Sequence, residues 1–171
     1  MRVAVLGAGS WGTTVASLAA ARNETTLWAR GPDVAAEIRD EHTNAAYLPG
    51  FELPKQLHAS SDLEEVVRDA DVLIAGVPSH GFREVLEQAV PHVRPWIPIV
   101  SLTKGFEAGT LLRMTEVIKD VMPGHPAAAL SGPKLGWVAS ISTERGKSRF
   151  ITRTGCSLTE QTSTTKAFLG R

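Results

Sequence analysis

Three glycines near the amino terminus have the spacing of a loop that binds phosphate groups. Gly7, Gly9 and Gly12 lie in the segment GAGSWG, which follows the apolar run Arg2–Leu6 and precedes an alanine-rich stretch. This is the strand-then-helix setting that a dinucleotide loop requires. The first glycine permits a tight turn, the second lets backbone N–H groups approach a pyrophosphate, and the third permits close packing. Free N–H groups at a helix start attract phosphate, so we expect dinucleotide binding here rather than a ligand-free turn.

A basic residue stands where NAD-selective dinucleotide domains carry an acid. That acid, about twenty positions after the glycines, binds the ribose 2′-hydroxyl. This sequence instead has Arg30, at the end of the apolar run Leu27–Ala29. An arginine can pair with a 2′-phosphate, which favours NADP, or tolerance of both NADP and NAD. A solvated surface arginine is the alternative reading.

Lys104 follows another predicted strand, in the segment SLTKG at 101–105. A lysine at a strand end suits a phosphate or carboxylate as a point charge. Residue type alone decides little, because loop lysines are usually solvated.

The remaining chemistry-bearing side chains form no recognisable site. The five histidines show no metal-ligand spacing, so we expect no metal centre. His80 follows Pro78-Ser79, and a helix-start position explains it better than catalysis. No residue can be assigned as the catalytic acid or base.

Alternating strands and helices would bring these loops together. Short apolar runs predict strands, and helical spacing or a capping box at Ser61–Glu64 predicts helices between them. The expected strands are Arg2–Leu6, Thr25–Trp28, Leu57–Ala59, Asp71–Val77, Ile97–Leu102 and Ala127–Leu130. The expected helices are Gly12–Arg22, Pro32–Arg39, Ser61 to about Arg68, Phe82–Ala89 and Leu111–Val121.

This order predicts an α/β fold of the Rossmann type. Its mostly parallel, doubly wound sheet has helices on both faces, and its ligands bind outside the carboxyl ends of the strands. Those ends hold the glycine loop, Arg30 and Lys104.

Composition excludes several classes of protein. The 171 residues carry 18 basic and 18 acidic side chains, and 43% are apolar, which excludes general disorder. The neutral total gives no case for nucleic-acid binding, and a single cysteine excludes a disulfide framework. No apolar run reaches the ~18–20 residues of a membrane span. We expect a protein of the cytoplasm, with no signal peptide at its start.

The net charge and the Ser/Thr content of the sequence change near residue 134, although the total charge is zero. Residues 134–171 carry seven Lys/Arg against two Asp/Glu, and twelve of these residues are Ser or Thr. Residues 1–133 carry eleven Lys/Arg against sixteen Asp/Glu. We expect a dinucleotide-binding domain at 1–133 and a distinct Ser/Thr-rich basic tail at 134–171, in which Trp137–Ile141 and Phe150–Thr152 are the candidate strands.

Six segments in order resemble bacterial NAD(P)-dependent glycerol-3-phosphate dehydrogenase. They are VAVLGAGSWGTTVA at 3–16, LWAR at 27–30, NAAYLPGFELP at 44–54, ADVLIAGVPSH at 70–80, SLTKGFE at 101–107 and LSGP at 130–133. The NxxYLPG and SLTKG segments are more telling than the glycines, and they disfavour other Rossmann dehydrogenases.

The resemblance implies hydride transfer between NAD(P)H and dihydroxyacetone phosphate, giving sn-glycerol 3-phosphate for phospholipid synthesis. The matching cofactor residues are Ser10, Trp11, Arg30 and Lys104, and Gly136 stands at a further cofactor position of the family, where the residue type differs. The matching substrate residues are Lys104 and Gly132, so Lys104 would lie on the substrate phosphate side. A small-molecule substrate is implied, and a homodimer is left open.

The sequence departs from the family after Pro133. The family has a small or polar residue, an apolar residue and Ala where this chain has Lys134, Leu135 and Gly136. Its helical C-terminal domain, which supplies the catalytic lysine, is absent from residues 134–171. We expect a shifted reading frame, a truncation, a chimeric end or a disordered tail. A non-catalytic NAD(P)-binding remnant is therefore the alternative function.

Overall fold

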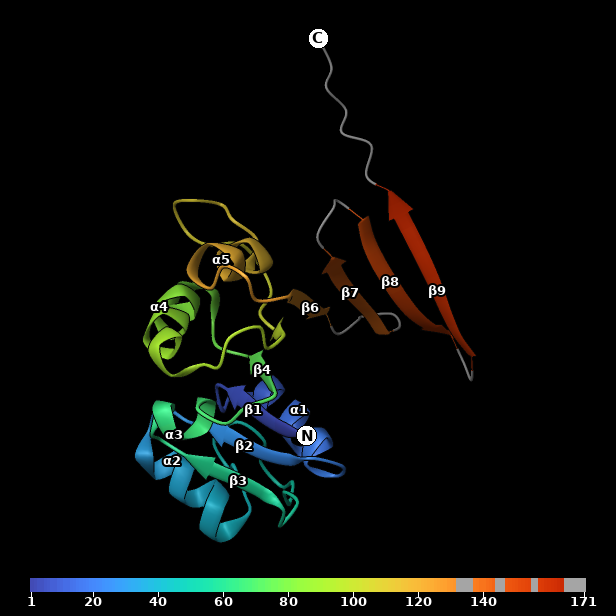
Figure 1. Cartoon of the computed structure of the whole chain (residues 1–171). Helices are drawn as coiled ribbons and strands as arrows, with labels where there is room; N and C mark the ends of the chain where they lie inside the picture. The colour runs from blue at the N-terminus through green and yellow to red at the C-terminus, as the bar shows by residue number, and fades with distance from the viewer. Residues whose placement is uncertain (132–136, 144–146, 155–156, 165–171) are drawn as a thin grey trace.

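The computed structural model describes the backbone of residues 1–131, 137–143, 147–154 and 157–164, and the side chains of residues 1–130. Strands and helices alternate along the first of these ranges (Figure 1). The strands are β1 Arg2–Leu6, β2 Glu24–Trp28, β3 Leu57–Ser60, β4 Val72–Ala75, β5 Ile99–Ser101, β6 Ala127–Ser131, β7 Trp137–Thr143, β8 Lys147–Thr154 and β9 Ser157–Thr164. The helices are α1 Ser10–Ala20, α2 Pro32–Ala36, η1 Glu37–Glu41, α3 Leu63–Val67, α4 Ser79–Ala89, η2 Val90–His92 and α5 Met114–Val121.

The strand order confirms the predicted doubly wound sheet. The order is β3-β2-β1-β4-β5-β6-β7-β8-β9, and every pair from β3 to β6 is parallel. The chain starts at β1, winds outward to β3, and returns to the other side of β1 at β4. A crevice forms at this switch point, because the loops after β1 and β4 leave in opposite directions.

Beyond β6 the described strands continue the same sheet in antiparallel pairs, β6 with β7, β7 with β8 and β8 with β9 (Figure 1). The expected strands at 137–141 and 150–152 are confirmed and extend further than expected. The strand at 157–164 is missing from the sequence prediction, because its sequence, SLTEQTST, contains no apolar run.

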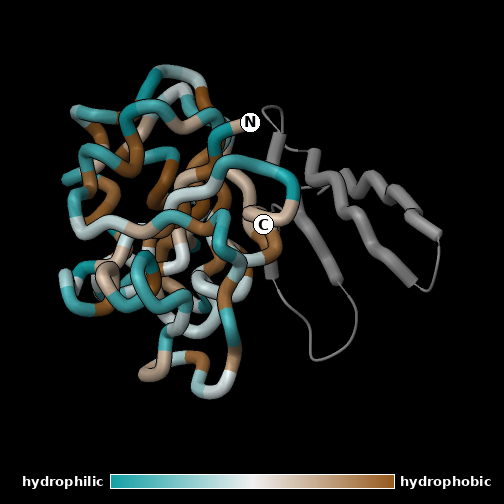
Figure 2. The backbone as a smooth tube through the Cα atoms, turned by 90° about the horizontal axis from the view of Figure 1, so that it is seen from below, coloured by the Kyte–Doolittle hydropathy of each residue, from teal (hydrophilic) through white to brown (hydrophobic). Residues whose placement is uncertain are grey.

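Apolar side chains bury both faces of the parallel sheet. Alternate residues of β1 point to opposite faces, so Ala4 and Leu6 pack with α3, α4 and α5, whereas Val3 and Val5 pack with α1, α2 and η1. Figure 2 shows the resulting apolar interior of the described chain. Helices on both faces fix the strands, and the strands fix the loops at their carboxyl ends.

Four predicted helix starts differ from the structure. Helix α1 begins at Ser10 rather than Gly12, and α4 begins at Ser79 rather than Phe82. The cap of α3 is Asp62, whose Oδ1 accepts a hydrogen bond from the Glu65 N–H at 3.2 Å, so the cap lies one residue beyond the expected Ser61. Helix α5 begins at Met114 rather than Leu111, because Leu111 has a left-handed backbone with φ 59°. The Glu116 carboxylate then caps the start of the helix, because it accepts from the Arg113 N–H and from Arg113 Nη2, both at 2.8 Å.

Candidate dinucleotide-binding site

The glycine loop joins β1 to α1, and two of its glycines are required by the fold itself. Gly7 has φ 104°, and a Cβ there would lie 3.0 Å from the backbone carbonyl carbon and oxygen of Gly76. A Cβ at Gly12 would lie 1.9 Å from the carbonyl oxygen of Gly7. The tight turn predicted at Gly7 is therefore present. The close approach predicted at Gly12 is also present, and the atoms that Gly12 approaches belong to Gly7 of the same loop.

Gly9 differs from both, because a Cβ there would meet nothing within 4 Å. Its carbonyl accepts the N–H of Thr13 at 2.9 Å and so begins α1. The first turn of α1 contains no acidic side chain. An anion in front of Gly9 would therefore meet the positive end of the helix without an opposing charge.

The loop forms one wall of a cleft of about 910 Å³ at the carboxyl edge of the sheet. Its volume lies in the range of small-molecule sites. Three loops after β1, β4 and β5 supply its lining. The lining residues are Gly9, Ser10, Trp11, Gly12, Gly76, Val77, Pro78, Ser79, Leu102, Thr103 and Lys104.

A second cleft of about 280 Å³ adjoins the first. Gly9, Gly76, Val77 and Pro78 line both clefts. The second cleft extends to Gly7 and to the end of β2, where Arg30 and Gly31 lie. The predicted residues on either side of the glycine loop therefore share one continuous depression.

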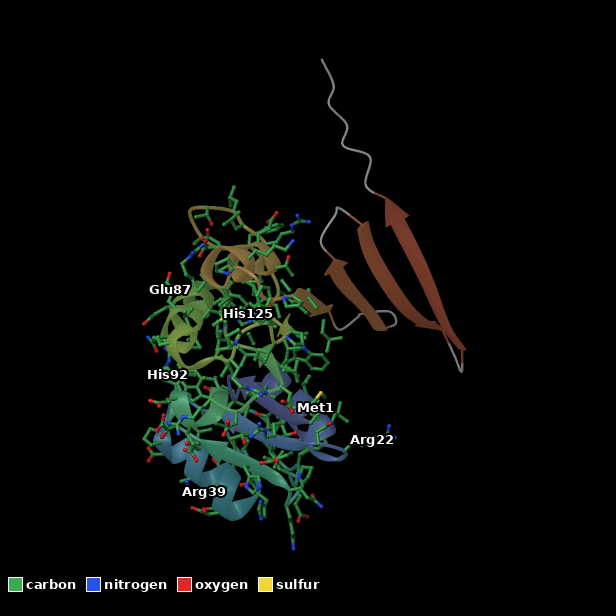
Figure 3. The ribbon with its side chains drawn as sticks, in the orientation of Figure 1. Met1, Arg22, Arg39, Glu87, His92 and His125 are labelled. Carbon is green, nitrogen blue, oxygen red and sulfur yellow. The ribbon has the colours of Figure 1, made fainter. Side chains whose placement is uncertain are left out.

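Arg30 is exposed at the outer end of this second cleft. A Cβ at Gly81, in the first turns of α4, would lie 3.6 Å from its Nη2 atom. Within residues 1–130, no carboxylate pairs with Arg30. By contrast, exposed Arg39 is bound to Asp40 at 2.8 Å, and it lies at the periphery of the helical layer (Figure 3).

Lys104 lies at the other end of the depression, just after β5. Thr103 holds its loop against the loop after β4, since its hydroxyl donates to the Val77 carbonyl at 2.5 Å. The Thr103 N–H donates to Ser101 Oγ at 3.1 Å. Lys104 itself is exposed, and no carboxylate within residues 1–130 pairs with it.

A second anchor holds the far side of the Lys104 loop. Arg83 on α4 binds Glu107 through two hydrogen bonds, at 2.7 and 3.1 Å, and binds Asp120 on α5 at 2.6 Å. The guanidinium and the Thr110 hydroxyl hold the pKa of the Glu107 carboxyl below its usual range, and the two carboxylates raise the pKa of Arg83. Both carboxylates are therefore directed at Arg83, and neither pairs with Lys104.

Sequence reasoning missed the contribution of residues 42–54. Tyr47 lines the second cleft, and its carbonyl accepts a hydrogen bond from Ser10 Oγ at 2.7 Å. Asn44 is fully buried against the glycine loop. The NxxYLPG segment, which contains both residues, was the available signal, although it assigned neither residue a role in the site.

Several expectations fall elsewhere. His80 lies in the first turn of α4, as predicted, and also lines the second cleft. Gly132 and Gly136 lie outside the described residues. Among the residues that the structure describes, no group of three His, Cys, Asp or Glu side chains could hold a metal ion. In that same part of the chain, no helix is long and apolar enough to cross a membrane.

The switch-point cleft and its glycine loop define a dinucleotide-binding domain of the Rossmann class. The family model for the N-terminus of NAD-dependent glycerol-3-phosphate dehydrogenase matches residues 2–139, and the chain belongs to this family. The match ends within β7.

Named relatives agree with this assignment. Glycerol-3-phosphate dehydrogenase [NAD(P)+] 2 of Sphingopyxis alaskensis is 53% identical over 135 residues, which cover 79% of this chain and 40% of the relative. Glycerol-3-phosphate dehydrogenase [NAD(P)+] 1 of Mycobacterium tuberculosis is 50% identical over 135 residues, with 78% and 40% covered. The solved glycerol-3-phosphate dehydrogenase of Coxiella burnetii superposes with a TM-score of 0.71 at 34% identity, covering 78% of this chain and 41% of that one. The chain thus spans about 40% of the length of the curated relatives that it matches.

Proposed function

We propose that this chain is the cofactor-binding part of an NAD(P)-dependent glycerol-3-phosphate dehydrogenase. The reaction is hydride transfer between NAD(P)H and dihydroxyacetone phosphate, giving sn-glycerol 3-phosphate for phospholipid synthesis. The observation that carries the proposal is the continuous depression from Arg30 past Gly9 to Lys104. The cofactor, when bound, supplies the hydride.

The residues present fit such a cofactor. The open space in front of Gly9 and the start of α1 accept the pyrophosphate. Arg30 pairs with the 2′-phosphate of NADP, and its charge also tolerates NAD, which lacks that group. Ser10, Trp11 and Gly12 form the wall along which the dinucleotide runs into the larger cleft.

Lys104 attracts the substrate. The phosphate of dihydroxyacetone phosphate carries negative charge, and an exposed lysine with no acidic partner within residues 1–130 is a suitable point charge for it. Gly132 and Gly136 belong to the proposed site by family resemblance. No described residue is assigned as the acid or base that exchanges a proton with the substrate oxygen. The proposed cytoplasmic location and a homodimer accompany this reading.

The second candidate is a non-catalytic NAD(P)-binding module. It is favoured by the described residues, none of which is assigned as the acid or base that the reaction requires. Loss of a positioned acid or base typically costs on the order of 10²–10⁴ in rate. Cofactor binding would persist in such a module, because the glycine loop, Arg30 and Lys104 all lie in the domain that forms the two clefts.

One experiment separates the two candidates. The purified 171-residue chain is assayed for oxidation of NADPH and of NADH that depends on dihydroxyacetone phosphate, together with calorimetric titration of each cofactor. Turnover above the substrate-free background supports the dehydrogenase. Binding without turnover supports the module, and neither binding nor turnover by folded protein overturns both.

A further inference from the structure

The segment 42–54, here called the strap, is attached to the glycine loop although it lies more than thirty residues later in the chain. Three hydrogen bonds join them. Ser10 Oγ donates to the Tyr47 carbonyl at 2.7 Å, and the other two bonds come from Asn44. At its own base, the strap is fixed to η1 by the Glu37 carboxylate, which accepts from Thr43 Oγ1 at 2.9 Å and from the Ala45 N–H at 2.6 Å.

Asn44 makes the central contact of the strap. Its side chain is 0% exposed, and its Nδ2 group donates to the Ala8 carbonyl and to Thr13 Oγ1, both at 2.9 Å. Each of the two amide protons therefore has one acceptor. Both acceptors flank Gly9, one in the loop and the other in the first turn of α1.

The bond to Ala8 also decides where the N–H of Gly9 points. The peptide unit between Ala8 and Gly9 is planar and trans, so its carbonyl and its N–H point in opposite directions. Holding the carbonyl toward buried Asn44 turns the N–H of Gly9 away from the strap. Gly9 lines both clefts, so the N–H is turned away from the strap at a residue that a ligand in either cleft would approach.

We infer that Asn44 is a positioning residue for pyrophosphate binding, acting through the Ala8–Gly9 peptide unit. This inference rests on the proposed function, since it assigns a residue to the dinucleotide site. Asn44 touches neither cleft itself. The Asn44 side chain keeps the loop ordered in the free protein, so that the loop N–H groups are aligned before the ligand binds.

The test compares ligands with and without a pyrophosphate on Asn44→Leu. Leucine has a similar size but no donor, so the Ala8 carbonyl loses its partner. We expect calorimetry to show affinity for ADP-ribose falling by about tenfold, because the loop must then be ordered when the ligand binds. Affinity for adenosine 2′-phosphate, which lacks a pyrophosphate, stays within about twofold of wild type.

Asn23→Leu is the matched control. Asn23 Nδ2 donates to the Ala19 carbonyl at 3.1 Å, at the opposite end of α1, and its loss should change neither affinity. Equal loss of both ligands in a folded Asn44→Leu protein, or no loss of ADP-ribose, overturns the role of Asn44. If wild type binds neither ligand, the proposed function fails as well.

A second measurement on the wild-type chain covers the case in which Asn44→Leu does not fold. Hydrogen bonds on the two sides of one peptide unit polarise each other. The side-chain amide resonances of Asn44 should therefore shift when ADP-ribose binds and stay in place with adenosine 2′-phosphate. Resonances that are unmoved at saturating ADP-ribose overturn the inference.

Discussion

Gly9 is the one glycine of the loop that the fold itself does not require. Gly7 and Gly12 are needed to build the loop, since a side chain at either would meet backbone atoms. The space in front of Gly9 is empty. A glycine in open space is explained by something that approaches from outside, which is the role proposed for the pyrophosphate.

Gly9→Val is therefore expected to fold and to lose binding of both NADPH and NADH. The added side chain extends into the cleft and blocks the pyrophosphate, while nothing within 4 Å of its Cβ is displaced. Circular dichroism should show wild-type structure, and calorimetry should show no binding. Gly12→Ala is the contrasting variant, because its Cβ overlaps the Gly7 carbonyl and destabilises the fold by about 1–3 kcal/mol or more. A folded Gly9→Val protein that binds NADPH like wild type would refute the assignment of the loop.

Arg30→Asp should weaken binding of NADPH far more than binding of NADH. A hydrogen-bonded charge pair is worth roughly 1.5–3 kcal/mol, so the expected loss for NADPH is about 10- to 150-fold. NADH has no 2′-phosphate and should change by less than about threefold. Titration of both cofactors measures the difference.

Arg22→Asp is the control for this change. Arg22 is also exposed, but it lies before β2, at the amino ends of the parallel strands, whereas the clefts lie at the carboxyl ends (Arg22 is labelled in Figure 3). Its substitution alters the total charge by the same amount. Equal losses for the two cofactors in Arg30→Asp, or an equal effect of Arg22→Asp, would remove the proposed role of Arg30.

At this scale the sequence predicted most of the described site. Glycine spacing identified the loop, and strand ends located Arg30 and Lys104. Asn44 could not be assigned from residue type, because its role depends on a contact with a carbonyl 36 residues away. Long-range contacts of this kind leave no periodic signal in the chain.

The loop after β5 is held in position by ion pairs. Residues 103–113 run from the cleft to the start of α5, and Arg83 connects this loop to both α4 and α5. The Arg83 side chain is only 29% exposed and that of Glu107 only 13%, so water screens this pair less than it screens a pair on the open surface. The ion pair therefore holds the loop that carries Lys104.

Glu107→Gln should lower the thermal midpoint at neutral pH and matter less in acid. Arg83 and Thr110 lower the pKa of Glu107 in the folded chain, so the carboxylate stabilises the fold above the ordinary glutamate pKa of about 4.3. That stabilisation is lost as the pH falls through the lower, folded-state pKa. Thermal unfolding of wild type and variant across this range measures the effect.

Glu84→Gln provides the control, because Glu84 lies next to Arg83 on α4. Glu84 lines the same surface hollow as Arg83 and Glu107, and it accepts a hydrogen bond only from the exposed side chain of Gln88, at 3.3 Å, within the described residues. Its substitution should leave the midpoint and its pH dependence close to wild type. A difference between wild type and Glu107→Gln that grows on acidification would contradict the account of this anchor.

Elements with strong periodicity or β-branched runs were predicted within a few residues. Side-chain hydrogen bonds decide the boundary at Asp62 for α3 and at Arg113 for α5. Helix α4 begins three residues before the expected Phe82, without a side-chain cap. Strand β9 has no apolar run, and its pairing with β8 defines it instead. Local sequence therefore indicates which element forms, whereas capping and pairing decide where it begins.

The whole molecule is organised around one edge of its parallel sheet. The loops after β1, β2, β4 and β5 meet at the carboxyl ends of these strands, and the two clefts follow this edge. Doubly wound topology brings these loops together in space although they are far apart along the chain. The fold class was predictable from strand–helix alternation, whereas the continuity of the two clefts required the structure.

The domain division stays a prediction at this scale. The change of composition after Pro133 predicts a distinct tail, while the family match extends to residue 139. Translating the encoding DNA in the other two reading frames would test whether the frame is shifted after Pro133. A family-like continuation there supports the shift, and its absence counts against it.

The most direct test of the central claim is a crystal structure of this chain with NADP⁺. The account predicts a pyrophosphate against the backbone N–H groups at Gly9 and the start of α1, the 2′-phosphate beside Arg30, and the nicotinamide in the larger cleft toward Lys104. A dinucleotide bound elsewhere, or no bound dinucleotide at saturating NADP⁺, would contradict it.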